Sequence, residues 1–210
     1  TFAGDITAGT SFTGVSGSTL TFDGAGAQTI TGAFTTAGDN RGDFIVNNTG
    51  GVVTFASKIG ANAGNGAGDL TLAASTDVIF KDTIDVEVVT LAGKVQFDGT
   101  VTADGALTLT AGATVKPGTG FASGATVIAA AGAMTDGDIT IEMPSTIGDG
   151  ETLVVFDAGG GTTDATYTVT DTALFTYAAV RHDGNDTVTV TATKRTSAAM
   201  GSTLGVTSEA

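Results

Sequence analysis

Short apolar segments alternate with polar residues along most of the chain, with the period of two that places successive side chains on opposite faces of a strand. Glycine, aspartate, asparagine or Ala-Gly separates the segments, and these residues favour turns. The unit recurs up to about Gly120. Its clearest copies are "STLTFDG" (18–24), "AQTITG" (27–32), "DFIVNN" (43–48), "GVVTFAS" (51–57), "GDLTLAA" (68–74), "KVQFDGT" (94–100) and "GALTLTAGATV" (105–115).

Such short strands, about 8 to 12 residues apart, predict an all-β domain, and the spacing alone leaves a sandwich, a barrel and a solenoid open. Three features favour the solenoid. The copies resemble one another, as stacked repeats do. Two-residue hairpin turns of the Asn-Gly kind are scarce. The inward positions are small or β-branched, which suits a narrow interior. We therefore predict a right-handed parallel β-helix (a solenoid) with turns of roughly 20 residues.

The alternating segments become longer after Gly120. The sequence of residues 121–134 allows either a strand or a short helical turn. The best antiparallel hairpin is 173–194, where "HDGND" turns and "TVTVTAT" returns. A hairpin there would cover the unpaired edge of the last turn. We predict solenoid repeats over 1–120, further coils with an antiparallel C-terminal hairpin cap over 121–194, and a linker or disordered tail over 195–210.

Composition narrows the partners of the chain. Its 22 acidic and 8 basic residues give a net charge of −14, which disfavours nucleic acid and anionic lipid. Cysteine is absent, so disulfides and thiolate metal sites are excluded. No apolar run approaches the roughly 18 residues of a membrane helix, and we expect no membrane insertion by this segment. The chain begins without Met or a signal segment, so we expect a piece of a longer product.

The phrases "LTFDG", "LTLTAG" and "VQFDGTV", followed by "GDGETLVVFDAGGGTTDATYTV" and "LFTYAAVRHDGNDTVTVTATK", resemble the passenger regions of bacterial autotransporters and related β-strand-repeat surface proteins. The part from about Gly148 to Lys194 is similar to the segment that closes such a passenger. The resemblance implies an extracellular β-helix at the bacterial cell surface. It also implies the role of an adhesin, an S-layer component or a scaffold.

Catalytic chemistry has little support in the sequence. The single histidine, His182, falls in the predicted turn "RHDGND", where we interpret it as solvated. A nucleophilic mechanism needs a base that a third group positions, and one histidine without cysteine offers no such set. We therefore expect no enzyme and assign no catalytic residue.

The densest acidic group is a second candidate for chemistry, and it consists of Asp77, Asp82, Asp85 and Glu87. On a strand, Asp85 and Glu87 would share one face. Sugar-binding clefts usually offer aromatic platforms and, for acidic sugars, basic partners, and this stretch has only Phe80 and Lys81. We interpret the group as a solvated face.

Calcium is the cofactor that the sequence favours. "GNGAGDLTL" (64–72) is similar to a glycine-rich Ca²⁺ repeat, in which carbonyls and an aspartate supply oxygen ligands. "DGDITIE" and "HDGND" are acidic turns of a kind that binds Ca²⁺. The predicted metal ligands are Asp69, Asp136, Asp138, Asp183 and Asp186.

These observations predict a non-enzymatic extracellular structural protein that self-associates on or from the bacterial cell surface, as a surface layer, fibre or scaffold. One alternative is an adhesin that binds a host or glycan receptor through the loop Gly60–Asp69. Another is a polysaccharide-active β-helix enzyme that uses Asp77, Asp82 or Asp85.

Overall fold

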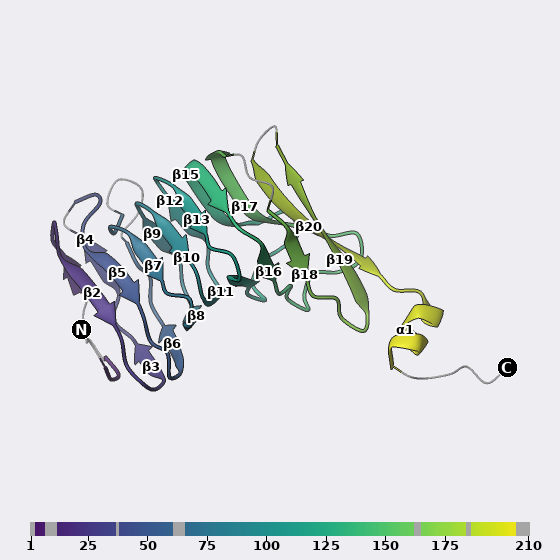
Figure 1. The fold of residues 1–210 in the computed structure, drawn as a ribbon, viewed down its shortest axis with the longest axis horizontal. Helices are drawn as coiled ribbons and strands as arrows, with labels where there is room; N and C mark the ends of the chain where they lie inside the picture. The colour runs from purple at the N-terminus through teal and green to yellow at the C-terminus, as the bar shows by residue number, and fades with distance from the viewer. Residues whose placement is uncertain are drawn as a thin grey trace.

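The computed structural model describes residues 3–6, 12–36, 38–60, 66–161, 165–183 and 186–204. Over these residues the chain forms β-strands and one short helix, and most strands pair in parallel. The body is elongated, with successive strands side by side and the termini at opposite ends (Figure 1). The predicted all-β class with parallel sheets is therefore confirmed.

The strands fall into three rows, each built from parallel neighbours. The first row contains β2 (Thr19–Phe22), β5 (Asp43–Val46), β7 (Leu70–Leu72), β10 (Val89–Leu91), β13 (Leu107–Leu109) and the end of β15 (Thr126–Asp136). The second row contains β3 (Gln28–Ile30), β6 (Val52–Phe55), β8 (Asp77–Phe80), β11 (Lys94–Phe97), β14 (Thr114–Pro117), β16 (Ile139–Ile141) and β18 (Tyr167–Val169). The third row contains β1 (Phe12–Gly14), β4 (Phe34–Thr36), a bridge at Ile59, β9 (Ile84–Val86), β12 (Val101–Ala103), the start of β15 and β17 (Thr152–Gly160).

The chain visits the rows in the same order, so each turn adds one strand to each row. This arrangement is compatible with a β-solenoid. The register is continuous although the turns differ in length: 18 residues separate the partners Val89 and Leu107, and 27 separate Leu107 and Met134. The extra residues therefore leave the strands at the corners and do not disturb the pairing.

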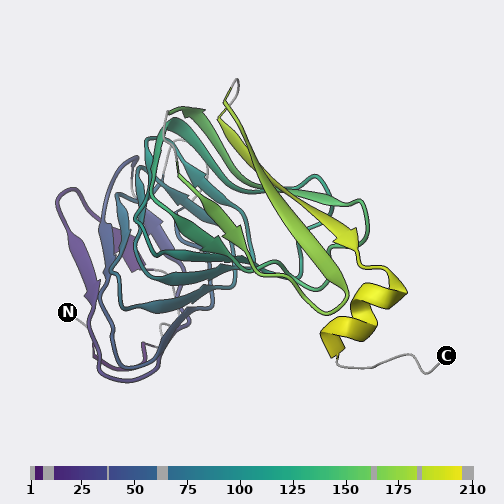
Figure 2. The ribbon, with the colours of Figure 1, turned by 45° about the vertical axis from the view of Figure 1, so that its right-hand side comes forward.

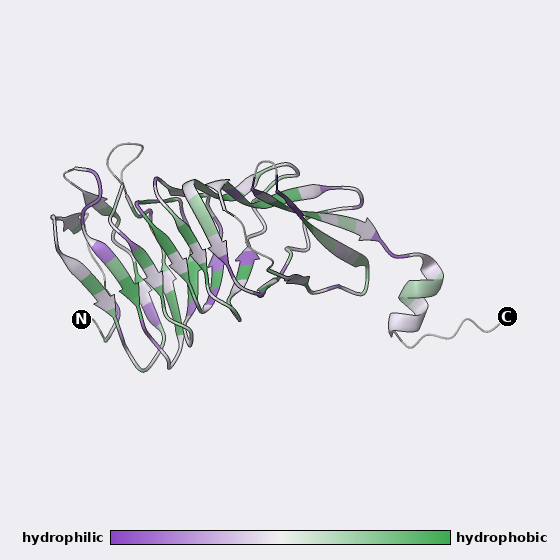
Figure 3. Ribbon diagram, turned by 45° about the horizontal axis from the view of Figure 1, so that its top comes forward, coloured by the Kyte–Doolittle hydropathy of each residue, from purple (hydrophilic) through white to green (hydrophobic). Residues whose placement is uncertain are grey.

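The core lies between the rows, where alternate side chains of each strand are buried. Apolar positions recur from strand to strand along the body (Figure 3). Phe55, Phe80 and Phe97 are partners in the second row, and their rings stack with centroids 4.9 and 5.5 Å apart. Large side chains thus stack on their counterparts in the next turn, which explains why the sequence phrases repeat.

A buried asparagine fixes one corner between the first and second rows. The side-chain amide of Asn48 donates hydrogen bonds to the Gly26 carbonyl at 2.7 Å and to Gln28 Oε1 at 2.8 Å. Its Oδ1 accepts hydrogen bonds from the backbone N–H groups of Gly50 and Gly51. Because all these polar groups find partners, burial of the amide is tolerated.

The sequence of residues 121–134 allowed either a strand or a short helical turn. In the structure this segment is a strand from Thr126 onward. β15 pairs with β12 in the third row and then with β13 in the first row. Its pairing with β17 shifts register between Ala130 and Ala133. This irregularity turns the strand around the corner, so one strand serves two rows.

The predicted antiparallel hairpin is confirmed. β19 (Phe175–His182) and β20 (Thr187–Lys194) pair antiparallel along their whole length, and β20 also pairs antiparallel with β17. The hairpin extends past the last turn toward the C-terminus (Figure 2). The sequence predicted that His182 lies in the turn. In the structure it is the last residue of β19.

The tail contains a helix that the sequence analysis did not predict, α1 (Ser197–Leu204). The backbone N–H of Ala199 donates a hydrogen bond to Thr196 Oγ1 at 3.3 Å, so Thr196 is the N-cap of this helix.

Residues 205–210 of the predicted tail and 61–65 of the predicted loop lie outside the described residues. The domain boundaries at 120 and 194 stay predictions. In the described part of the chain, no helix combines the length and apolar character needed to cross a membrane.

Candidate functional site

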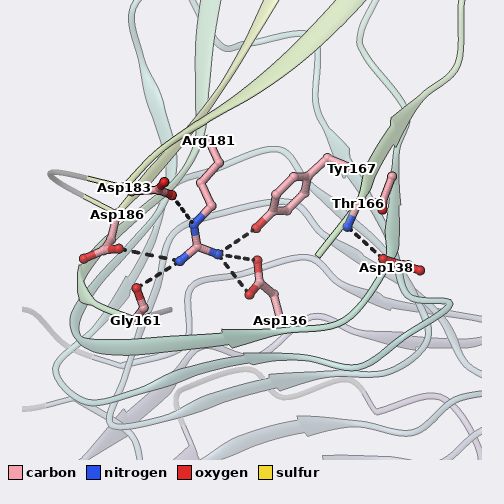
Figure 4. Close-up of polar contacts among 8 residues, drawn as sticks. All are labelled: Asp136, Asp138, Gly161, Thr166, Tyr167, Arg181, Asp183 and Asp186. Atoms are coloured by element: carbon pink, nitrogen blue, oxygen red, sulfur yellow. Dashed lines mark hydrogen bonds and ion pairs between the residues drawn. The ribbon is translucent and has the colours of Figure 1, made fainter. Parts of the chain in front are cut away.

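Two of the predicted calcium ligands lie apart from the others. Asp69 is exposed immediately before β7, and its backbone N–H donates a hydrogen bond to Asp43 Oδ1 at 3.2 Å. Partial burial and the negative charge of Asp43 raise the pKa of Asp69. Asp138 is also exposed, and its Oδ1 accepts a hydrogen bond from the Thr166 N–H at 2.7 Å. It lies apart from Asp136, Asp183 and Asp186 (Figure 4).

Asp136 occupies a position where the other turns place an apolar side chain. It is the last residue of β15 and pairs with Leu109 in the first row. The equivalent inward positions of the preceding turns are Leu91, Leu72, Val46 and Phe22. The Asp136 side chain has 0% of its surface exposed. A carboxylate at such a core position needs a compensating partner.

Arg181 of β19 is that partner. Its Nη1 lies 3.1 Å from Asp136 Oδ1 and 3.0 Å from Oδ2, so one nitrogen contacts both carboxylate oxygens. Nη1 also lies 3.5 Å from the hydroxyl of Tyr167, and Nη2 donates a hydrogen bond to the Gly161 carbonyl at 3.0 Å. Figure 4 shows the guanidinium at the centre of these groups. We call these residues, with Asp183 and Asp186, the Arg181 cluster.

Asp183 and Asp186 complete the Arg181 cluster from the hairpin turn. Arg181 Nε lies 3.4 Å from Asp183 Oδ1, and Nη2 lies 3.5 Å from Asp186 Oδ1. Burial raises the pKa of Asp136, and the charge and hydrogen bonds of Arg181 oppose that effect. Three predicted calcium ligands therefore surround a guanidinium, which supplies the positive charge within the cluster.

The Arg181 cluster connects segments that are distant in the sequence. Asp136 ends β15, Gly161 follows β17, Tyr167 begins β18 and Arg181 belongs to the hairpin. The arrangement fastens the hairpin to the last turn of the body. The acidic residues of the cluster were predicted from the sequence, but Arg181 and Tyr167 were not. The available signal was a lone arginine among the apolar and small residues of β19.

The acidic residues 77–87 do not form one group. Asp77 lies in β8 of the second row and Asp82 in the exposed turn after it, whereas Asp85 lies in β9 of the third row. Asp77 and Asp85 therefore belong to different rows of the body.

Asp85 and Glu87 instead meet acidic residues from other turns. Carboxylate oxygens of Asp39, Glu87 and Asp104 all lie within 4.8 Å of one another. Burial and the charges of Asp104 and Asp39 raise the pKa of Asp85. We call Asp39, Asp85, Glu87 and Asp104 the corner carboxylates, because they gather where the chain passes from the third row to the first.

A shallow hollow of about 330 Å³ lies on the third row beside the corner carboxylates. Small side chains and two carboxylates, Asp104 and Asp157, line it. Its lining, made of described residues, includes neither an aromatic ring nor a basic group. The hollow thus lacks the stacking platforms that favour sugar binding.

The side chain of His182 contacts the neighbouring strand of the hairpin. Its Nε2 lies 2.9 Å from Thr189 Oγ1 on the neighbouring strand, and the residue is exposed. This placement agrees with its interpretation as a solvated residue.

Comparison of the chain with protein-family models, with curated proteins and with solved structures gives no match to any of the three.

Proposed function

We propose that this chain is a non-enzymatic, extracellular structural protein of the bacterial cell surface. In this proposal it is a right-handed parallel β-helix whose copies associate end to end into a fibre, layer or scaffold. The continuous registers of the three rows support a stiff body, since each turn rests on an equivalent neighbour.

The location of exposed apolar side chains carries the proposal. Among the described residues, the large hydrophobic side chains with high exposure are Val15 at 56%, Leu174 at 54% and Val180 at 48%. Val15 lies between β1 and β2 at one end of the body, and the other two lie at the hairpin at the opposite end. Both ends thus carry apolar surface that a second copy would bury.

The terminal strands support the same contact. β2 and β19 are the outermost strands of the eleven-stranded order. An outer strand offers main-chain groups to another chain, and a contact between unlike ends repeats to give a filament. The net charge of −14 opposes close approach of two copies, so added salt should favour assembly.

Sedimentation velocity and negative-stain microscopy of the full chain test the proposal. We expect concentration-dependent polymers that increase with salt. The variant Leu174→Asp/Val180→Asp should remain monomeric, because it places charges in the proposed contact. The matched control Ala74→Asp/Ser75→Asp adds the same charges in an exposed turn in the middle of the body and should assemble like the unmodified protein.

Two results would overturn the proposal. One is a protein that stays monomeric at high concentration and high salt, and glycan binding by that monomer would favour the adhesin. The other is equal assembly of the end variant and the control, because the contact would then not involve the hairpin.

A further inference from the structure

Strands from separate turns of the body bring the corner carboxylates together. Asp39 precedes β5, Asp85 lies in β9, Glu87 follows β9 and Asp104 follows β12. β9 and β12 are paired, with Asp85 opposite Thr102, and the Gly105 N–H donates a hydrogen bond to the Glu87 carbonyl at 2.6 Å. The pairing of the strands therefore fixes the backbone that carries three of the four side chains.

The corner carboxylates have no basic partner. Among the described residues, the ion pairs of lysine and arginine involve Asp98, Glu142, Asp136, Asp183, Asp186 and Asp171, and none involves the four corner carboxylates. Three of these carboxylates lie within 4.8 Å of one another, at which distance like charges repel. This group differs from the Arg181 cluster, where the protein supplies its own cation.

Asp85 gives a second and independent observation. Both of its carboxylate oxygens are buried, each with less than 1 Å² exposed, and neither accepts a hydrogen bond from a described residue. A buried carboxylate without a hydrogen bond or a counter-charge is costly. The negative charges that most affect Asp85 are those of Asp104 and Asp39. The geometry therefore calls for a cation at this position.

We propose that Asp39, Asp85, Glu87 and Asp104 bind one Ca²⁺ ion at this corner. Oxygens that share a Ca²⁺ ion at about 2.3 to 2.6 Å lie at most about 5 Å apart, which agrees with the 4.8 Å within which the oxygens of Asp39, Glu87 and Asp104 lie. The set consists only of carboxylates, which suit a hard cation and not Zn²⁺ or Cu²⁺. Four carboxylates exceed the one or two that Mg²⁺ usually takes.

The surroundings allow the ion to enter. Asp39 and Asp104 are exposed, so the site opens to solvent, while the two carboxylate oxygens of Asp85 are buried. The Gly66 N–H donates a hydrogen bond to Asp39 Oδ1 at 3.2 Å, which orients that carboxylate. In the next turn the chain has Ala131 and Gly132 beside Gly105, so no further carboxylate extends the group there. The ion would join turns of the body that are separate in the sequence.

Calorimetric titration of the chelator-treated full chain with CaCl2 tests the proposal, with thermal unfolding as a second readout. We expect one site, with an affinity in the range of about 10⁻⁴ to 10⁻³ M that extracellular calcium modules show. Saturating Ca²⁺ should raise the unfolding temperature, because the ion binds only the folded chain. Equal concentrations of MgCl2 should raise it less.

Two variants and a control locate the site. Asp104→Asn and Asp85→Asn should each weaken Ca²⁺ binding at least about tenfold, since affinity depends on the number of charged ligands. In chelator, Asp85→Asn should also raise the unfolding temperature, because it removes a buried charge without a partner. Asp77→Asn removes a carboxylate from the second row and should leave binding unchanged.

The proposal fails if the folded protein shows neither heat of binding nor a shift in unfolding temperature up to millimolar Ca²⁺. It also fails if Asp104→Asn binds like the unmodified protein, or if Asp77→Asn weakens binding as strongly. These outcomes concern the monomer, so they are independent of whether copies assemble.

Discussion

Arg181 Nη1 contacts both carboxylate oxygens of Asp136, at 3.1 and 3.0 Å, although 45 residues separate the two in the chain. Asp136 stands at the end of an inward row of apolar side chains, and Arg181 reaches it from the hairpin. The last inward position of the first row is thus occupied by an aspartate, and its ion pair with Arg181 fastens the hairpin to the body.

Removing the arginine alone should be strongly destabilising. Arg181→Met leaves a buried carboxylate without its partner, and we expect the free energy of unfolding to fall by about 3 to 5 kcal/mol in urea denaturation. Lys94→Met is the control, because its ion pair with Glu142 is exposed and should contribute only about 0 to 1 kcal/mol. Arg181→Met/Asp136→Leu should recover most of the loss, since leucine continues the apolar row. A double variant as unstable as the single one would contradict this account.

The stacked phenylalanines predict a second large effect. Phe80 lies between Phe55 and Phe97 in the second row and is 1% exposed, so Phe80→Ala should cost about 3 to 5 kcal/mol of unfolding free energy. Phe80→Leu should cost clearly less, because it keeps more of the buried volume. The control Val180→Ala, at a side chain 48% exposed, should stay within about 0.5 kcal/mol of the unmodified protein. Equal losses for Phe80→Ala and Val180→Ala would mean that the ring stack is not a stabilising element.

Close approach of neighbouring turns predicts opposite results at two glycines. A Cβ added at Gly50 would collide with the Ala25 carbonyl, whereas one added at Gly26 would meet nothing within 4 Å. Gly50→Ala should therefore lower the free energy of unfolding by about 1 to 3 kcal/mol, because the backbone must move. Gly26→Ala should change it by no more than about 0.5 kcal/mol. Urea denaturation of both variants measures the difference, and equal stability would show that the turns separate without cost.

Asp98 predicts a small dependence of stability on pH. Partial burial would raise the pKa of Asp98, but hydrogen bonds from Lys81 and Gln96 and the charges of Lys81 and Lys116 hold it below its usual value of 3.8. The ionised carboxylate therefore stabilises the fold above that pH, and the contribution is lost as the pH falls through the lowered value. Because the ion pair with Lys81 is partly exposed, Asp98→Asn should cost only about 0 to 1 kcal/mol near neutral pH. Urea denaturation of Asp98→Asn and of the unmodified protein, at neutral pH and in acid, measures this dependence. The two free energies of unfolding should become equal in acid, and a difference that stays constant with pH would contradict the assignment.

Local patterns predicted the strands well, because alternation of side chains is a property of neighbouring residues. The phrases Leu70-Thr71-Leu72 and Val95-Gln96-Phe97 are strands with the expected apolar side chains buried. The bend in β15 was not predictable in the same way. Its run of alanines has neither a strand period nor a turn signal, and only pairing with β12 and β13 fixes its course.

The polar groups were predictable only in part, because they depend on register between turns. Nothing local indicates that Asp136 and Arg181 meet. The pair Asp85 and Glu87 was recognised, but its partners Asp39 and Asp104 become neighbours only after the strands stack. For α1, by contrast, a local signal was present: Thr196 precedes an alanine-rich segment, which is a capping residue before good helix formers.

The unequal turns have a consequence for engineering. From Leu107 to Met134 the chain takes 27 residues to move one strand along the first row, where Val89 to Leu107 needs 18, and both steps keep their partners aligned. The entropic cost of closing a loop rises only slowly with its length, so residues added at a corner should lower the free energy of unfolding only slightly. A foreign peptide inserted at a corner would project from the side of the body with its two ends held by fixed strands. The same body could present many different peptides in this way, each at a known height along its axis.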